Sequence, residues 1–232
     1  MHAASADPAR FTPSSDQSLL IYFGEQISLQ AHQRIRKFLR LLEIEPIAGI
    51  RNLHPAYCSL LIKFDPLMWR HDDLEKILKQ YLARLQDIHL SPPRQVEIPV
   101  CYGGEYGPDL LDVSTIHGMT PDQVIELHSA NTYVVYFLGF VPGFAYLGEL
   151  PESLVTPRLS TPRRKVPAGS VGIAGSQTGV YPVATPGGWR LLGRTPLSIL
   201  QPDHPELSLL SIGDRVRFSP ISPEKFATLV NA

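Results

Sequence analysis

Long apolar runs and cysteines are both scarce in this chain of 232 residues. No apolar run approaches the roughly 18 residues that a membrane-spanning helix needs, so we expect no membrane partner. The two cysteines, Cys58 and Cys101, form no CxxC pair and lie in apolar or strand-like segments. This usage predicts reduced structural thiols in a cytoplasmic protein. Residues 1–16 lack the basic segment and apolar run of a signal peptide, and we predict that they form a disordered leader.

Acidic residues are absent between Glu152 and Asp203, although the net charge of the whole chain is only −1. This acid-free stretch contains six basic residues and seven glycines: Arg158, Arg163, Arg164, Lys165, Arg190 and Arg194, with Gly169, Gly172, Gly175, Gly179, Gly187, Gly188 and Gly193. The preceding segment, Glu97 to Glu152, has eight acidic residues and no Lys or Arg.

The charge pattern has two explanations. Glycine lets the backbone approach a ligand and each guanidinium is a rigid fork of donors, so the acid-free stretch is suited to phosphate or carboxylate oxygens. Pairing of the acidic and basic segments inside one domain explains the pattern equally well. In either case the lack of a long basic run argues against a nucleic-acid partner.

Several catalytic motifs are missing. The chain has neither GxxxxGK[ST] nor a GxGxxG that opens a helix, and it lacks GxSxG, HExxH and paired CxxC motifs. Its eight histidines are scattered, so we predict no metal site. The spacing of Gly169, Gly172 and Gly175 resembles a phosphate-binding loop, but turns between strands produce the same spacing.

The first half of the chain predicts a small α/β domain over residues 17–93. Residues 18–23, 47–53 and 57–64 are short apolar runs typical of strands. Ser28 is a candidate N-cap for a helix to about Leu42, and Asp72 or Asp73 for a second helix with a stripe of leucines. The order β-α-β-β-α, closed by a strand over 95–100, predicts a ferredoxin-like arrangement of α+β class.

The second half, residues 94–232, predicts a β-rich domain. Thr120 and Pro121 begin a helix to about Ser129, and residues 133–140 form a nearly continuous apolar strand. Short β-prone runs then alternate with Gly and Pro, which predicts an all-β barrel or sandwich with a few helices at its edge. The predicted short strands cover 170–173, 180–183, 189–192, 197–200 and 216–219, before a last helix that begins at Ser222-Pro223.

Four ordered motifs in the second half carry a resemblance to a known family. They are Gly139-Phe-Val-Pro-Gly-Phe-Ala-Tyr-Leu-Gly148, Thr156-Pro-Arg-Leu-Ser-Thr-Pro-Arg163, the glycine-rich segment from Val166 to Pro182, and Pro186-Gly-Gly-Trp-Arg-Leu-Leu-Gly-Arg-Thr-Pro196. These residues resemble the bacterial family that contains the B component of 5-oxoprolinase, the kinase inhibitor KipI and the first component of allophanate hydrolase. The resemblance extends over roughly residues 19–219.

The resemblance implies a cyclophilin-like β-barrel after the N-terminal domain, and a hetero-oligomeric enzyme in which this chain has obligate partners. Such a B component would work with a C component, its direct partner, and with an A component to open the lactam 5-oxoproline to L-glutamate. ATP with Mg²⁺ would be a co-substrate of the complex, with no tightly bound cofactor. Two alternatives remain: a KipI-like inhibitor of a sensor histidine kinase, and one component of an allophanate- or urea-type amide hydrolase.

The activity implied by the resemblance suggests roles for particular residues. Arginines in a dry cleft stabilise charge on phosphoryl oxygens, and a histidine is suited to proton transfer near neutral pH. We therefore expect His128 and Arg163 to be catalytic, and the following to bind substrate or phosphate: Arg158, Arg194, Gln177, Tyr181, Gly169 and Gly175. Phe144 and Tyr146 are expected at the partner interface. The structural alternatives are backbone-bonded loop arginines, a satisfied buried histidine and, for the aromatic residues, the barrel core.

Overall fold

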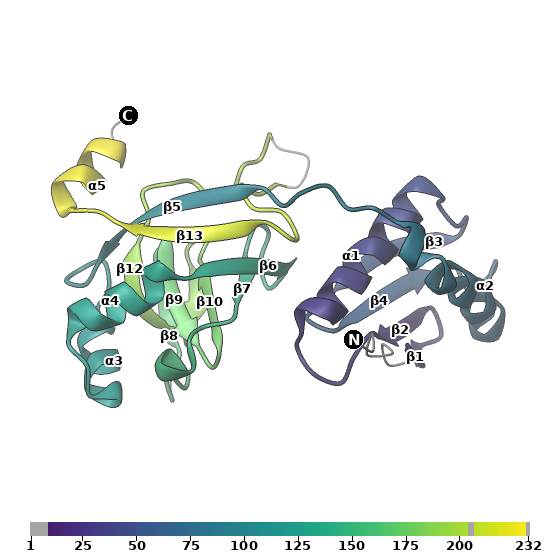
Figure 1. Ribbon diagram of the computed structural model, residues 1–232, viewed down its shortest axis with the longest axis horizontal. Coiled ribbons are helices and arrows are strands. Elements are labelled where there is room, and N and C mark those ends of the chain that lie inside the picture. Colours follow the sequence, from purple (N-terminus) through teal and green to yellow (C-terminus); the bar gives the residue numbers. More distant parts are fainter. Residues whose placement is uncertain (1–8, 204–206, 231–232) are drawn as a thin grey trace, which may run out of the picture. The chain divides into compact units, whose positions relative to one another are not determined.

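The computed structural model describes residues 9–203 and 207–230, and the chain divides into two units at Pro92 (Figure 1). The first unit contains a four-stranded antiparallel sheet of strand order β1-β2-β4-β3. Its elements are β1 (Arg10–Ser15), β2 (Ser18–Tyr22), α1 (Leu29–Ile44), β3 (Ile50–Pro55), β4 (Ser59–Phe64), α2 (His71–Ala83) and a 3₁₀ turn (Leu85–Asp87). One hydrophobic core lies between this sheet and its helices.

Strand β1 corrects the prediction of a disordered leader. Residues 1–8 lie outside the described residues, but Arg10–Ser15 pair with β2, and Phe11 packs against the core of the first unit. The Pro and Ser residues of this segment hid the strand. Strand β1 is the fourth strand of the first sheet, at its edge. The strand expected to close that sheet belongs instead to the second unit, where it covers residues 95–102. The finer names, ferredoxin-like and cyclophilin-like, stay predictions.

Helix starts in the first unit were predicted with mixed success. The Ser28 side chain accepts a hydrogen bond from the backbone N–H of Ala31, which confirms the predicted cap of α1. Helix α2 instead has Arg70 as its N-cap residue, with Asp72 and Asp73 in its first turn. There the two carboxylates lie at the positive end of the helix dipole.

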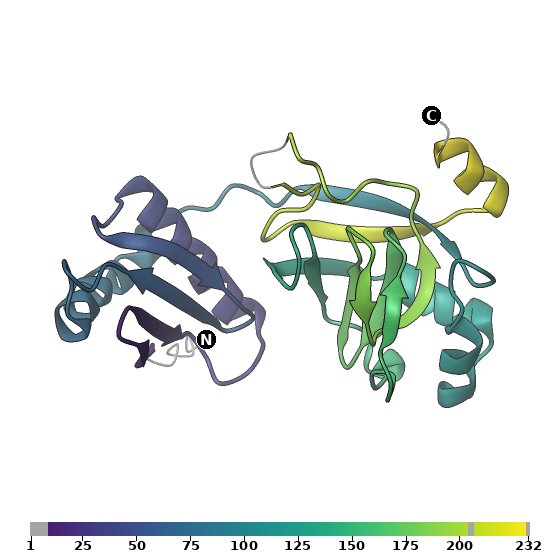
Figure 2. The same cartoon turned by 180° about the vertical axis from the view of Figure 1, so that it is seen from behind.

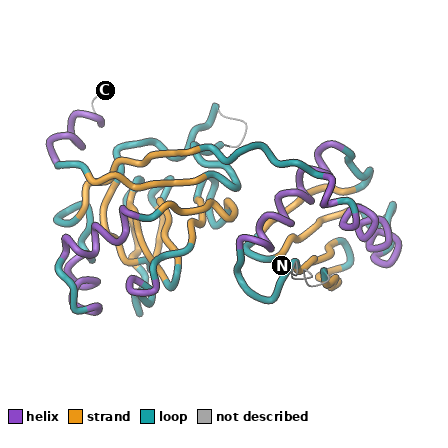
Figure 3. The backbone as a smooth tube through the Cα atoms, viewed as in Figure 1, coloured by secondary structure: helices purple, strands orange, loops and turns teal. Residues whose placement is uncertain are grey.

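The second unit is built on a closed seven-stranded barrel of order β10-β7-β6-β13-β5-β12-β9. Its strands are β5 (Gln95–Tyr102), β6 (Thr132–Leu138), β7 (Ala145–Gly148), β9 (Ser170–Ala174), β10 (Gln177–Val180), β12 (Arg190–Arg194) and β13 (Arg215–Pro220). A separate two-stranded sheet pairs β8 (Arg163–Val166) with β11 (Thr185–Gly187). The tube in Figure 3 shows this strand-rich unit, and Figure 2 shows its green strands from behind.

Helices α3 (Leu110–His117) and α4 (Pro121–Ala130) lie next to each other, and α4 packs against β13 (Figure 1). The capping box of Thr120 and Gln123 confirms the predicted start of α4. A 3₁₀ turn (Glu152–Leu154) precedes β8, and α5 (Pro223–Val230) ends the described chain. The strand expected over 197–200 is only an isolated bridge between Leu200 and Ser208.

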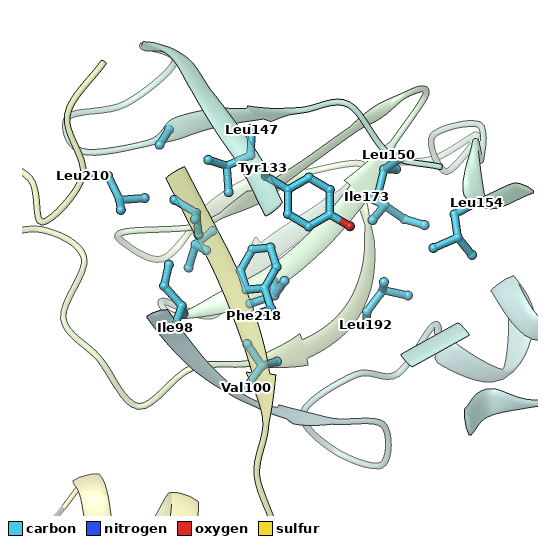
Figure 4. Packing of buried hydrophobic residues seen from close by; sticks show 14 of the residues in the cluster. Ile98, Val100, Tyr133, Leu147, Leu150, Leu154, Ile173, Leu192, Leu210 and Phe218 are labelled. Atoms are coloured by element: carbon cyan, nitrogen blue, oxygen red, sulfur yellow. The ribbon is translucent and has the colours of Figure 1, made fainter. Parts of the chain in front are cut away.

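Alternating side chains of the barrel wall serve two different cores. Leu192 belongs to the large cluster that also contains Tyr133 and Phe218 (Figure 4). The adjacent residue Leu191 belongs to a smaller cluster with Trp189. Successive side chains of a strand point to opposite faces, so the smaller cluster lies on the other face of the wall. This second core positions the candidate site.

Candidate functional site

An aromatic pocket of about 260 Å³ opens on this second core. We use the name aromatic pocket for the cavity lined by these residues: Phe140, Phe144, Tyr146, Arg158, Pro162, Tyr181, Pro186, Gly187, Gly188 and Trp189. Phe144 lies at the centre of the cluster, with its ring edge-on to Tyr146, Tyr181 and Trp189 at centroid distances of 4.9–5.5 Å. Edge-to-face packing of this kind stabilises the arrangement of the rings.

Two glycines form the floor beneath these rings. Gly172 of β9 and Gly179 of β10 are paired across the sheet. A Cβ at Gly179 would come within 3.1 Å of both Phe144 and Trp189, and one at Gly172 within 3.3 Å of Trp189. The glycine-rich motif therefore lets large rings lie directly on the backbone, a use that the sequence analysis did not foresee.

Arg158 supplies the charge of the aromatic pocket. Backbone contacts hold the chain on both sides of it. Before it, Thr156 forms an isolated β-bridge with Gly175, and after it the Leu159 N–H donates to the Gly188 carbonyl at 2.8 Å. The Arg158 side chain is exposed, and within residues 9–203 and 207–230 it has neither a hydrogen bond nor an ion pair. Its guanidinium is free to bind a carboxylate or phosphate.

Tyr181 supplies a hydroxyl close to the backbone of the lining. Burial raises the pKa of Tyr181, and the Trp189 backbone N–H and the positive charge of Arg158 oppose this effect. Burial raises the pKa of Tyr146 in the same way, again opposed by Arg158. Both phenols thus stay protonated at neutral pH and keep a hydrogen-bond donor. The pocket combines an apolar lining, one cation and neutral hydroxyls.

Phe144 does not lie at a partner surface, contrary to the prediction. Its side chain is only 2% exposed because it is enclosed by the other rings of the second core. Tyr146 is half-buried and lines the pocket, with its ring stacked on Phe137 at 4.5 Å. The exposed aromatic residue of this segment is Phe140.

His128 is a core residue, and the structure contradicts its predicted role in proton transfer. The side chain is fully buried, stacked on Phe218 at 4.7 Å between ring centroids. Nδ1 lies 2.7 Å from the Tyr102 hydroxyl, and Nε2 lies 2.9 Å from Thr178 Oγ1. Burial lowers the pKa of His128 to about 3, so the ring is neutral at physiological pH.

Arg163 forms an ion pair in place of an open site. Its Nη2 lies 2.5 Å from Oδ1 of Asp109, while Oδ2 of Asp109 accepts the Leu191 backbone N–H at 2.7 Å. The carboxylate is buried and joins the start of α3 to β8 and β12. Arg190 also approaches an acidic residue, Asp112, at 3.8 Å. Pairing between the acidic and basic segments therefore accounts for Arg163 and Arg190, but not for Arg158.

The remaining predicted residues lie apart from the aromatic pocket. Arg194 and Gly169 line a different cavity of about 310 Å³ beside α5, where the Arg194 Nε donates to the Ala168 carbonyl at 2.8 Å. Gly169 has φ +80°, and a Cβ there would lie 2.5 Å from the Thr195 carbonyl oxygen. Its N–H donates to the Tyr181 carbonyl, so that amide is not available for a phosphate.

Gly175 and Gln177 belong to the turn between β9 and β10. The Gly175 N–H donates to Thr156, and Gln177 begins β10. Gln177 lies four residue steps before Tyr181 along this extended segment, a span of roughly 13 Å. In the described part of the chain no cluster of His, Cys, Asp and Glu could hold a metal ion. No helix there has both the length and the apolar character to span a membrane.

Known proteins resemble the chain over almost its whole length. The family model for the carboxyltransferase domain, subdomain C and D, matches residues 9–210. The 5-oxoprolinase B component of Escherichia coli O157:H7 is 61% identical over 211 residues, which cover 88% of this chain and 93% of that protein. The 5-oxoprolinase B component of Bacillus subtilis (strain 168) is 41% identical, over 91% and 92% of the two chains.

A solved structure agrees with these matches. The crystal structure of TTHA0988 superposes with a TM-score of 0.77 at 37% identity, over 89% of this chain. The chain spans 40% of the length of that protein. The family match and the identities together show that the chain belongs to the carboxyltransferase subdomain C and D family, alongside the B components of 5-oxoprolinases.

Proposed function

We propose that this chain is the B component of an ATP-dependent 5-oxoprolinase, a cytoplasmic complex with A and C components that opens 5-oxoproline to L-glutamate. The observation that carries the proposal is the 61% identity to a 5-oxoprolinase B component across 93% of its length. A pocket with one unpaired cation and an apolar lining fits a small cyclic carboxylate, which agrees with this assignment.

The chemistry explains why ATP would be required. The lactam of 5-oxoproline is a resonance-stabilised amide with a poor leaving group, and water attacks it slowly. Transfer of the γ-phosphoryl group of ATP to the lactam oxygen would make the ring carbon electrophilic. Attack by one water at that carbon and cleavage of the C–N bond would then give γ-glutamyl phosphate, with ADP as the other product. A second water would hydrolyse this acyl phosphate to glutamate and phosphate. Charge on the phosphoryl oxygens calls for positive groups and Mg²⁺ within the complex.

The aromatic pocket is the proposed site for 5-oxoproline on this chain. The Arg158 guanidinium would bind the substrate carboxylate, since a charge-assisted pair is the strongest contact that the lining offers. The rings of Tyr146 and Trp189 would enclose the five-membered ring. The Tyr181 hydroxyl, which stays protonated, would donate to the lactam oxygen.

Co-expression with candidate A and C components tests the proposal, with glutamate formation from 5-oxoproline measured with and without ATP. Glutamate that appears only with ATP supports the proposed function. An assembled complex that gives no product would contradict the lactam assignment and favour another small amide. Failure to assemble with matched partners would favour the kinase-inhibitor alternative, which autophosphorylation of a sensor kinase in the presence of the chain measures directly.

A further inference from the structure

The backbone at Phe140 adopts a rare conformation at the rim of the aromatic pocket. Its φ is +72°, and the Val141 N–H donates to the Gly139 carbonyl at 3.0 Å. A hydrogen bond between residues i and i+2 around a centre of positive φ makes a strained γ-turn. Positive φ in a bulky residue is a genuine outlier, because its Cβ crowds the neighbouring carbonyl oxygen.

Surrounding hydrogen bonds hold this turn in place. The Gly139 N–H donates to the Phe144 carbonyl at 3.0 Å, and the Phe144 N–H donates to the Val141 carbonyl at 3.1 Å. Gly143, with φ +81°, completes the reversal of the chain. Phe144 is itself fixed in the second core, so the turn has little freedom to relax.

The Phe140 ring gains little from this strained backbone within the chain itself. It is 59% exposed, and its one ring contact among the described residues is edge-on to Phe144 at 5.5 Å. A glycine would remove the strain, and a polar residue would suit the exposure. Strain that the folded chain does not repay points to a binding role. The ring lines the same pocket as the unpaired Arg158.

We propose that Phe140 is a substrate-binding residue whose ring covers the apolar face of a small cyclic carboxylate held by Arg158. This inference rests on the proposed function, in which that ligand is 5-oxoproline. The methylene groups of the ligand ring would cover the exposed phenyl face, and the removal of both surfaces from water would supply affinity. The fixed turn orients the phenyl ring before the ligand arrives, which reduces the entropy lost on binding.

The test uses the assembled complex and steady-state kinetics with 5-oxoproline. Phe140→Ala and Phe140→Gly should each raise KM about tenfold and change kcat by less than about twofold, as loss of ground-state binding does. Phe140→Tyr keeps the ring and should stay near the wild-type KM. Leu207 provides a matched control because it also has positive φ and is 45% exposed, yet does not line the pocket. Leu207→Ala should leave KM unchanged.

Thermal unfolding of the same variants separates the strain from the binding role. Phe140→Gly should unfold roughly 3 °C above Phe140→Ala, since only alanine keeps a Cβ at positive φ. An unchanged KM in both variants, with an active wild-type complex, would overturn the inference and leave the proposed function standing. Weaker assembly at unchanged KM, seen by size-exclusion chromatography, would assign Phe140 to partner contact instead. An assembled wild-type complex without activity on 5-oxoproline would overturn both proposals.

Discussion

At the scale of single residues, Arg158 is the cation that the fold leaves available at the aromatic pocket. Arg158→Ala should raise the KM for 5-oxoproline at least tenfold in the assembled complex, because a charge-assisted hydrogen bond contributes about 2 kcal/mol. Arg158→Lys should recover part of this loss, since it keeps the charge but not the planar fork. Steady-state kinetics of complexes with the wild-type chain, Arg158→Ala and Arg158→Lys would measure these differences in KM.

Arg164 is the control for Arg158. Its side chain is exposed on β8, makes no hydrogen bond or ion pair in the described part of the chain, and does not line the aromatic pocket. Arg164→Ala should therefore change KM by less than about twofold. Equal effects of the two alanine variants would show that the basic stretch acts through its overall charge, and Arg158 would lose its assigned role.

His128 makes stability depend on pH. The Thr178 hydroxyl donates to the Gly172 carbonyl, so its oxygen accepts from the Nε2–H of His128, and Nδ1 accepts from Tyr102. Both ring nitrogens are satisfied only in the neutral form. Burial lowers the pKa of His128 to about 3, whereas the unfolded chain protonates this residue near 6.5.

The free energy of unfolding should therefore fall as the pH drops from 6.5 towards 3. Below pH 6.5 the unfolded state takes up a proton that the folded state does not, so stability falls by at most about 1.4 kcal/mol per pH unit. Urea denaturation of wild type and His128→Gln at pH 7 and pH 5 measures the difference. The variant should be less stable at pH 7 but lose less on acidification; an equal loss would contradict the assignment.

At the scale of secondary-structure elements, Asp109 connects the start of α3 to β8 and β12 through hydrogen bonds. It bonds both Arg163 and the Leu191 N–H. Arg163→Ala should destabilise the fold by about 2 kcal/mol, because it leaves a buried carboxylate with one partner fewer. The double variant Arg163→Ala/Asp109→Asn should lose less than the sum of the two single variants. Additive losses in chemical denaturation would show that the pair is not coupled.

Elements with strong local signals were predictable from the sequence. Ser28 and Thr120 mark the starts of α1 and α4 because a side-chain cap is a contact between near neighbours in the chain. Helix α3 was missed because Asp109 caps no backbone N–H of the helix and instead bonds distant residues. Leu111 and Ile116 are apolar but exposed, so the apolar residues of α3 do not mark a single buried face in the sequence.

For the candidate site, the sequence predicted some of the residues but not which of them lie together in one pocket. The motifs pointed to Arg158 and Tyr181 as binding residues, and these line one pocket. Phe144 and Tyr146, which were expected at the partner interface, line the same pocket. Arg194 and Gly169 lie at another cavity, since which face of a strand a side chain occupies depends on register. The role of Gly172 and Gly179 as a floor for rings depends on a pairing between strands that spacing alone does not reveal.

At the scale of the whole molecule, each unit has a hydrophobic core of its own. The first unit buries one cluster between its sheet and helices, and the second buries one cluster in its barrel and another at the aromatic pocket. Composition could not locate these cores, because apolar residues are spread over both halves. Because none of these clusters contains residues of both units, we expect the barrel unit to fold without the first unit.

A fragment of residues 93–232 should therefore fold alone. We expect one cooperative thermal transition, because its cores are made of residues within that range. Trp189 is 6% exposed and is the one tryptophan of this fragment, so its fluorescence should be blue-shifted below the transition and shift to the red on unfolding. Near-ultraviolet circular dichroism should lose its signal at the same temperature. A broad transition, or Trp189 emission typical of water at 25 °C, would show that the barrel needs the first unit to fold.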